Sequence, residues 1–194
     1  MSEKANINPR AAGRRRVLLG ATAAASGIAL LGAAQPALAD SPSRVVDEGR
    51  IRQLSVNYAL GTDAIGRNDK TAGLALYAKT FTDRAEIMVA GAPSTLRIGG
   101  AAWADFVESV FRGSHYDRTQ HLIGTINVLL GDGREERNRA TMSTYLHATH
   151  HVQDNSSVLI VLGTYDDVVV RHGNDWRIAR RTLSVMTSWT ETPA

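Results

Sequence analysis

His121 lies in the segment RTQHLIGT, residues 118–125, which otherwise has the composition of a buried β-strand. A histidine in such a strand is either a core residue with satisfied hydrogen bonds or a base that faces a pocket, because imidazole exchanges protons near neutral pH. Strict alternation along the strand assigns five side chains to one face: Thr119, His121, Ile123, Thr125 and Asn127. The opposite face receives Leu122, Ile126 and Val128. A face that mixes polar and apolar groups in this way is typical of a ligand pocket.

Asp63 is the natural partner for this histidine. It stands near the end of a predicted helix over residues 44–66, and a buried carboxylate is costly unless it is paired. A carboxylate beside His121 would fix the imidazole tautomer and stabilise the imidazolium, which makes the histidine an effective general base. The alternative for Asp63 is a helix-end residue in solvent.

Three more histidines follow in the segment TYLHATHH, residues 144–151. In an extended strand His147 and His151 share a face, whereas His150 points the other way with Leu146 and Ala148. A zinc site needs three or four converging ligands, which neighbours on one strand rarely supply. The sequence therefore predicts no metal site, and favours a polar pocket wall or a position at the sheet edge for these histidines.

Four aromatic residues are candidates for lining a pocket that holds a flat or ring-shaped ligand, although each could equally belong to the core: Tyr58, Trp103, Phe106 and Tyr165. A further group near the C-terminus is expected to anchor the last strand against the helices: Trp176, Arg177, Ile178 and Arg181. The arginines of this group have Glu86, Asp166 and Asp167 as candidate partners, and we assign the group a structural role.

The elements that must position these residues follow from hydrophobic periodicity and turn signals. Helical spacing covers residues 44–66, 70–78 and 101–111, and short strands are expected at 85–89 and 95–98. Longer β-rich runs, separated by turn residues, follow at 119–130, 140–152, 158–171 and 176–188. Helices followed by a meander of long strands predict an α+β fold, with the helices packed on one face of a curved antiparallel or mixed sheet.

The first predicted helix carries two apolar sets of side chains. One stripe contains Ile51, Leu54, Tyr58, Thr62 and Ile65, and a second set on the opposite side contains Val56, Ala59, Leu60 and Asp63. A helix that is apolar on two sides is expected to lie between two layers. On this basis Asp63 is expected to be buried.

The N-terminal residues 1–39 have the pattern of a secretory signal peptide. Arg14, Arg15 and Arg16 precede an apolar run that ends in small residues before Asp40. The arginine pair followed by Val17-Leu18-Leu19 resembles the twin-arginine export motif. We therefore expect export to the periplasm or the extracellular space, with residues 40–194 as one domain; an uncleaved membrane anchor is the alternative.

Composition narrows the function classes. Without residues 1–39 the count of Lys and Arg falls from 22 to 17 and that of Asp and Glu from 19 to 18, which leaves a net charge of −1 and no basic surface to argue for nucleic acid. There are no cysteines, so thiolate chemistry and cysteine-ligated metals are excluded. No stable membrane insertion is expected after processing.

Several segments together resemble the nuclear-transport-factor-2-like superfamily, in its SnoaL-like and scytalone-dehydratase-like branch. They are NYALGTDAIGRND, LYAKTFTDRAEI, RTQHLIGTINV and LGTYDDVVVRHGNDWRIARR, and the resemblance spans residues 45–188. It implies a cystatin-like α+β barrel, a cone-shaped curved sheet around the helices with an apolar pocket at one end.

The resemblance also implies roles for individual residues. Asp63 and His121 match the catalytic Asp–His dyad of the branch, and His150 matches a second pocket histidine. The tyrosines that polarise a substrate carbonyl in the branch fall at Thr62 and Val89 here, and a lysine of another member falls at Tyr58. Because these electrophilic partners are replaced, no known substrate is transferred to this chain.

The sequence favours a cofactor-independent lyase (dehydratase) or isomerase that acts on a small apolar hydroxy-carbonyl or ring compound through an Asp–His general base. A non-catalytic module that binds a hydrophobic ligand in the same fold is the alternative, since a fold hosts many functions. A purely structural or assembly role is the weakest of the three. The expected partner is a small apolar molecule, and assembly into a homo-oligomer such as a dimer is compatible with the long strands.

Overall fold

Three helices and six strands make up the part of the chain that the computed structural model describes, residues 42–132 and 136–192. The helices are α1 (Pro42–Gly66), α2 (Lys70–Thr80) and α3 (Gly100–Gly113). The strands are β1 (Phe81–Val89), β2 (Ala92–Ile98), β3 (Tyr116–Leu130), β4 (Arg139–Val152), β5 (Val158–His172) and β6 (Asp175–Glu191). The predicted signal peptide, residues 1–39, lies outside the described residues and stays a prediction.

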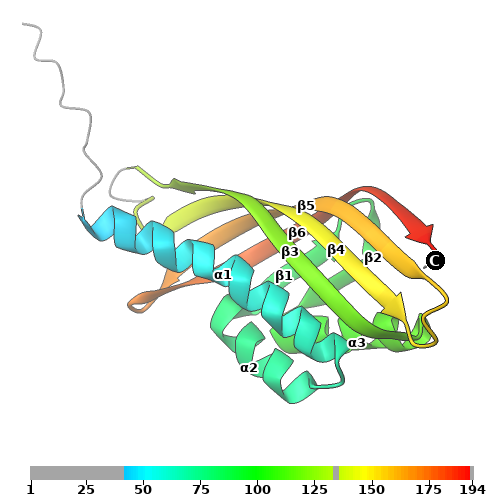
Figure 1. Cartoon of the computed structure of the whole chain (residues 1–194). Helices are drawn as coiled ribbons and strands as arrows, with labels where there is room; N and C mark the ends of the chain where they lie inside the picture. The colour runs from blue at the N-terminus through cyan, green and yellow to red at the C-terminus, as the bar shows by residue number, and fades with distance from the viewer. Residues whose placement is uncertain (1–41, 133–135, 193–194) are drawn as a thin grey trace, which may run out of the picture. The chain divides into compact units, whose positions relative to one another are not determined.

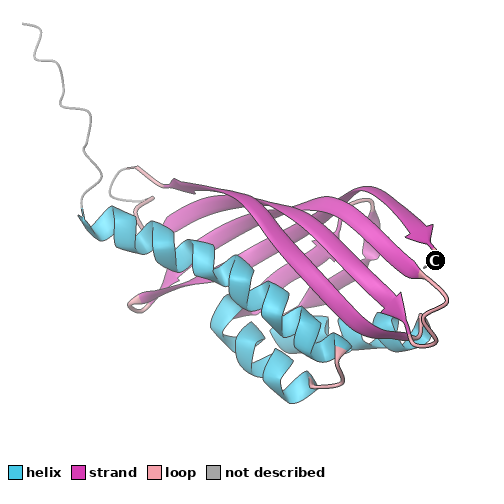
Figure 2. Cartoon of the chain, viewed as in Figure 1, coloured by secondary structure: helices cyan, strands magenta, loops and turns pink. Residues whose placement is uncertain are grey.

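The strands form one curved sheet in the order β2-β1-β6-β5-β4-β3, and all three helices lie on the same side of it (Figures 1 and 2). Strands β3 to β6 pair antiparallel in succession, as the hairpin signals predict. Strand β1 pairs parallel to β6, which makes the sheet mixed. The sheet does not close on itself, because β2 and β3 end the order as edge strands.

Helix α1 is buried on one side only, which corrects part of the two-sided prediction. Ile51 and Ile65 are fully buried, and Asp63 is buried as expected. Val56 and Leu60, however, are 38% and 52% exposed, because none of the described elements covers the outer side of the helix.

No helix of the described segments has the length and apolar character needed to cross a membrane.

Helices α1 and α2 approach each other closely at two glycines. A Cβ added to Gly73 would lie 2.5 Å from the Ile65 Cγ1, and one added to Gly61 would lie 2.9 Å from the Tyr77 ring. Real side chains do not tolerate such distances, so only glycine allows this crossing. The close approach brings the Tyr77 hydroxyl to 2.7 Å from the Thr62 Oγ1.

Strand β3 changes the face it turns toward the helices halfway along its length. Its pairing with β4 is interrupted between Gly124 and Asn127, where Thr125 has a φ of 44°, and such a bulge reverses the alternation beyond it. Before the bulge Thr119 and Ile123 point inward, and after it three residues pack against the core: Ile126, Val128 and Leu130. The prediction that His121 shares its face with Thr125 and Asn127 is therefore wrong, since strict alternation ignores the bulge.

The last strand is anchored as expected by Trp176 and Arg181. Both are buried, and the Trp176 Nε1 donates to the Asp47 carboxylate at the start of α1. Arg181 forms two hydrogen bonds of 2.7 and 2.6 Å with Asp167, one of its three candidate partners. Arg180, next to it, pairs with Glu86 on the surface. These contacts tie β6 both to helix α1 and to its neighbouring strands.

Candidate functional site

A cavity of about 390 Å³ lies between the helices and the inner face of the sheet. It brings together six of the seven candidate site residues, and these line its wall: Tyr58, Trp103, Phe106, His121, His150 and Tyr165. Asp63, the seventh, contacts His121. The rest of the wall is mainly aliphatic or aromatic, with Thr62 and Ser114 as further polar residues. A hollow of this size and composition suits a small, largely apolar ligand.

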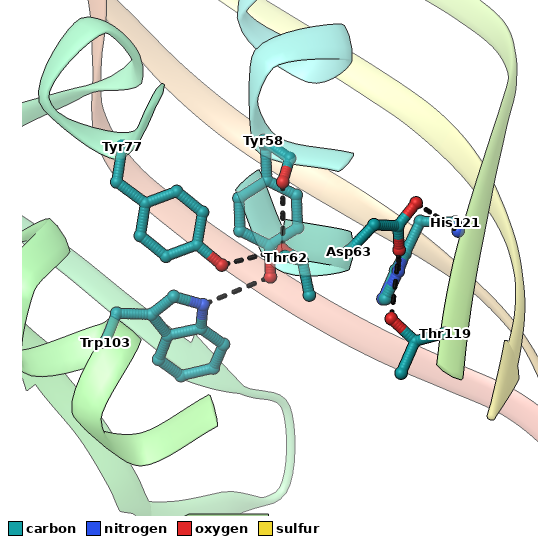
Figure 3. A network of polar contacts seen from close by, with 7 residues as sticks. All are labelled: Tyr58, Thr62, Asp63, Tyr77, Trp103, Thr119 and His121. Atoms are coloured by element: carbon teal, nitrogen blue, oxygen red, sulfur yellow. Dashed lines mark hydrogen bonds and ion pairs between the residues drawn. The ribbon is translucent and has the colours of Figure 1, made fainter. Parts of the chain in front are cut away.

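Asp63 and His121 form a direct contact at the cavity wall (Figure 3). The His121 Nδ1 lies 2.7 Å from the Asp63 Oδ1, and the two side chains are only 6% and 11% exposed. The same carboxylate accepts hydrogen bonds from the Thr119 hydroxyl at 3.1 Å and from the backbone N–H of His121 at 3.2 Å. With Nδ1 donating to a carboxylate, Nε2 is left as the proton acceptor of a ring that lines the cavity.

The local sequence explains why helix and strand meet here. Asp63 lies in the last turn of α1, and Gly66 ends that helix. A Cβ on Gly66 would lie 2.6 Å from the Thr119 Oγ1, so the glycine lets β3 pass close to the helix end. Sequence reasoning did not assign a role to Thr119. Its position two residues before His121, on the same face, was the available signal.

His150 is a buried neutral histidine beside the dyad. Its ring stacks on Tyr116 at 5.2 Å between centroids and meets the edge of the His121 ring at 5.5 Å. Burial, with a smaller contribution from His121, lowers the pKa of His150 to about 4. Its Nδ1 is buried and has no hydrogen-bond partner in the described protein. The ring lines the cavity, but this nitrogen is enclosed by the protein and not exposed at the wall.

The other two histidines of this strand point away from the cavity wall, as the alternation predicts. His147 is exposed and His151 is half-buried, while Leu146 and Ala148 line the cavity with His150. Within residues 42–132 and 136–192 no three His, Cys, Asp or Glu side chains gather in a way that could hold a metal ion.

A second polar network lies on the other side of Tyr58 (Figure 3). The indole N–H of Trp103 donates to the Tyr58 hydroxyl at 3.1 Å, and the Tyr77 and Thr62 hydroxyls share a hydrogen bond. Burial raises the pKa of Tyr77 well above its ordinary value, so this phenol stays neutral. Sequence reasoning missed Tyr77, because its helix carries no distinct apolar stripe that singles it out.

Arg181 lies behind two aromatic residues of the cavity wall. Its guanidinium is 4.2 Å from the centroid of the Tyr58 ring and 4.4 Å from that of Tyr165, at cation–π distance. Burial alone would lower the pKa of Arg181, yet the charge and hydrogen bonds of Asp167 outweigh it and raise that pKa. The arginine is therefore a permanent cation sealed beneath the cavity wall.

Several further wall residues were not predicted. Phe111 and Tyr116 enclose His150, and Val89, Leu183 and Val185 come from β1 and β6. The helical spacing of Phe111 with Trp103 and Val107 was a usable signal. The contribution of β1 and β6 was not accessible, since it depends on the parallel pairing of two strands about 90 residues apart.

These features, a curved mixed α+β sheet over helices with a largely apolar cavity, define the class of fold. The sequence profile of the SnoaL-like domain matches residues 43–182, and the chain belongs to that family. It is thereby a member of the nuclear-transport-factor-2-like superfamily, as the sequence resemblance predicts. Among proteins with curated descriptions, a sequence comparison finds no match.

Solved structures with the same fold are similar over most of their length. A candidate scytalone dehydratase from Novosphingobium aromaticivorans is 19% identical, with a TM-score of 0.59 over 78% of this chain and 92% of its own. A hexachlorocyclohexane dehydrochlorinase from Novosphingobium barchaimii is 12% identical, with a TM-score of 0.63 over 78% of this chain and 94% of its own. A protein from Nostoc punctiforme with a cystatin-like fold is 16% identical, with a TM-score of 0.52 over 72% of this chain and 91% of its own.

Proposed function

We propose that this protein is a cofactor-independent lyase of the dehydratase type, or an isomerase, acting on a small uncharged hydroxy-carbonyl compound. The observation that carries the proposal is the contact between Asp63 and His121 at the wall of a largely apolar cavity. A pair in which a buried carboxylate orients an imidazole is the arrangement expected of a general base.

In the proposed reaction the His121 Nε2 removes a proton from the carbon next to the substrate carbonyl. The electron pair of that C–H bond forms a carbon–carbon double bond as the hydroxyl on the neighbouring carbon leaves. The leaving oxygen takes a proton, which the imidazolium can return, and departs as water. Asp63 stabilises the imidazolium that exists between the two transfers, and Thr119 and the His121 backbone hold the carboxylate in place.

Tyr58 is the proposed hydrogen-bond donor to the substrate carbonyl. Its oxygen already accepts the indole N–H of Trp103, which orients the phenol and leaves its own proton to donate. A preorganised donor aimed at an oxygen that gains negative charge stabilises the transition state. His150, a neutral ring that lines the cavity, is the second candidate to hold a substrate oxygen.

The wall favours an uncharged substrate. None of its residues is a lysine, arginine, aspartate or glutamate. Asp63 and Arg181, which contact residues of the wall, are each bonded to a partner of opposite type. A charged ligand would lose its hydration without gaining an ion pair, which costs several kcal/mol by order of magnitude.

The test is a screen of neutral β-hydroxy ketones and related ring compounds, in which loss of water is followed by the ultraviolet absorbance of the conjugated product. His121→Ala is the variant, and His147→Ala, on the opposite face of the sheet, is the matched control. We expect turnover by the wild type and by His147→Ala, and a drop of about 10²–10⁴-fold for His121→Ala, with a cooperative unfolding transition in denaturant that shows the variant is still folded.

Two outcomes would contradict the proposal. If His121→Ala retained turnover, another group would be the base. If neutral ligands bound in the cavity, as shown by protection against thermal unfolding, but none was converted, the protein would be the binding module that the sequence leaves as the alternative.

We also propose that residues 1–39 direct export by the twin-arginine route, supported by the Arg15-Arg16 pair and the apolar run behind it. Replacing both arginines by lysine is expected to leave the full-length chain in the cytoplasm, as measured by cell fractionation and immunoblotting. Unchanged export would contradict this assignment.

A further inference from the structure

The end of β6 has a free edge. Strand β1 pairs along β6 only as far as Leu183, where the Ala90 N–H donates to the Leu183 carbonyl. Beyond that point β6 continues to Glu191 and pairs with β5 alone, out to the C-terminal end of the sheet (Figure 1). We call residues 185–191 the free edge of β6. Its second side offers backbone N–H and C=O groups to whatever lies beside it.

Each of the other two edge strands, β2 and β3, has an arginine side chain bonded to its backbone carbonyls, and within the described segments the free edge of β6 has none. On β2 the guanidinium of Arg97 donates to the carbonyls of Ser94 and Leu96. On β3 the Arg52 side chain from α1 donates to the Ile126 carbonyl at 2.5 Å. Occupying edge carbonyls with a charged side chain is a known way to block association of strands. Among the described residues, no element other than β5 forms a hydrogen bond with the free edge of β6.

The composition of the free edge also favours association. Residues 185–190, VMTSWT, contain no proline and no charged residue, and are rich in β-branched and aromatic side chains. Every residue from 185 to 191 is exposed, with Met186 at 73% and Trp189 at 41%. Proteins ordinarily interrupt such a run at an exposed edge with a charge or a proline.

We propose that the free edge of β6 pairs antiparallel with the same edge of a second copy of this chain, so that two sheets join into one across a two-fold axis. The middle residue, Ser188, would lie opposite Ser188 of the second copy. Met186 would then face Thr190, and Thr187 would face Trp189, so that no like charges meet and a threonine packs on an aromatic ring.

A second copy fits this edge better than a charged partner does. The six residues 185–190 carry no charge to attract an acidic or basic peptide. A symmetric antiparallel pair matches residues 186–190 with one another, and the one charged residue of the edge, Glu191, lies opposite Val185 rather than opposite a like charge. The free edge begins at Val185, which lines the cavity together with Leu183. Pairing there would therefore fix the strand that forms part of the cavity wall.

The first test uses the absence of cysteine in the chain. In the purified full-length chain Ser188→Cys would place two thiols opposite each other, and mild oxidation is expected to convert most of the protein into a disulfide-linked dimer on a non-reducing gel. Ser94→Cys, an exposed serine on the protected β2 edge, is the matched control and is expected to stay monomeric on the same gel. Cysteines at positions 186 to 190 in turn should crosslink most efficiently at the residue on the axis.

The second test measures association itself by sedimentation. Ser188→Lys would set two ammonium groups opposite each other and is expected to weaken the dimer about tenfold or more, whereas Ser94→Lys should leave it unchanged. A monomeric wild type at micromolar concentrations would overturn the proposal. So would a dimer that Ser188→Lys leaves intact and Ser188→Cys does not crosslink, since that dimer would use the outer face of the sheet around Leu122, Tyr145 and Met186.

Discussion

Two buried acid–base pairs of opposite character stand within the same fold. Asp63 bonds to one ring nitrogen of His121, and His121 lines the cavity wall. Asp167 and Arg181 are sealed in the core, with side chains that are 0% and 1% exposed. Each pair joins an acid to a base on a different element, Asp63 on α1 to His121 on β3 and Asp167 on β5 to Arg181 on β6. Only the first pair contains an imidazole, the side chain most often used as a general base, whereas a guanidinium keeps its proton.

The difference shows that burial alone does not identify a reactive group. Arg181 is more deeply buried than His121. It forms two hydrogen bonds with Asp167 and stacks on Tyr58 and Tyr165, and its unpaired nitrogen, Nη1, is enclosed in the core where no ligand reaches it. His121 is satisfied on one nitrogen only. An acid–base pair is therefore a candidate for chemistry where a cavity leaves one of its atoms to the ligand.

The sharpest way to break this comparison is to neutralise the acid of the cavity pair. Asp63→Asn keeps the size of the side chain but cannot stabilise an imidazolium, so turnover should fall about 10²–10⁴-fold on a substrate found by the screen. The measurement is kcat/KM, with Asp166→Asn on the exposed side of β5 as the control. Activity within twofold of the wild type would show that Asp63 is only structural.

Substitutions in the second pair, Asp167 and Arg181, should change the stability of the fold. Arg181→Met leaves Asp167 as an unpaired buried charge and is expected to cost about 3–5 kcal/mol in the free energy of unfolding. Replacing both residues, as Asp167→Leu with Arg181→Met, should recover much of that loss, because no charge is left buried. Unfolding in urea measures both variants. Equal stability of the single and the double variant would remove the distinction between the two pairs.

His150 adds a pH dependence to the cavity side of the comparison. Its pKa of about 4 in the folded protein lies below the ordinary value of 6.5, so the unfolded chain binds a proton that the folded one does not. The neutral His150 therefore contributes to the free energy of unfolding in full above pH 6.5. This contribution, roughly 2–3 kcal/mol, is lost as the pH falls toward 4.

Unfolding in urea between pH 7 and pH 4.5 checks this expectation. His150→Phe should flatten the dependence, because the aromatic ring is kept and the titrating group is removed. His147→Phe, on the exposed face of the same strand, should leave it as steep as in the wild type. A slope that survives His150→Phe would assign the titration to another group.

The smallest effect concerns the phenol that joins the two regions. Tyr58→Phe removes the hydroxyl bonded to Trp103 but keeps the ring above Arg181. We expect kcat to fall about 3–10-fold, the value of one hydrogen bond, with KM nearly unchanged. An equal loss of kcat in the Trp103→Phe variant would support the view that the indole positions the phenol. If kcat changed in neither variant, Tyr58 would be excluded as the donor.

Much of the fold follows from patterns that act over short distances. The helices and the four long strands lie where periodicity and turns place them, because both signals depend on neighbours in the chain. Asp63 and His121 could be paired from the sequence, since a buried acid requires a partner and the candidates were few. The family resemblance leads to the same two residues by a separate argument.

What could not be predicted depends on contacts between distant segments. The parallel pairing of β1 with β6 has no local signal, and with it the contribution of Val89 and Leu183 to the cavity was missed. Thr125 at the bulge is an ordinary strand residue by type, so the change of face in β3 was not visible. The exposure of Val56 and Leu60 shows the converse error, since an apolar side chain does not require a covering layer.

The bulge at Thr125 divides β3 into two functional halves. The inward residues before it build the dyad and the cavity wall, and those after it hold helix α1 against the sheet. Substitutions at inward positions of one half therefore change a different part of the molecule from those in the other half. One irregular residue thus lets a single continuous strand serve both the cavity and the packing of the helix.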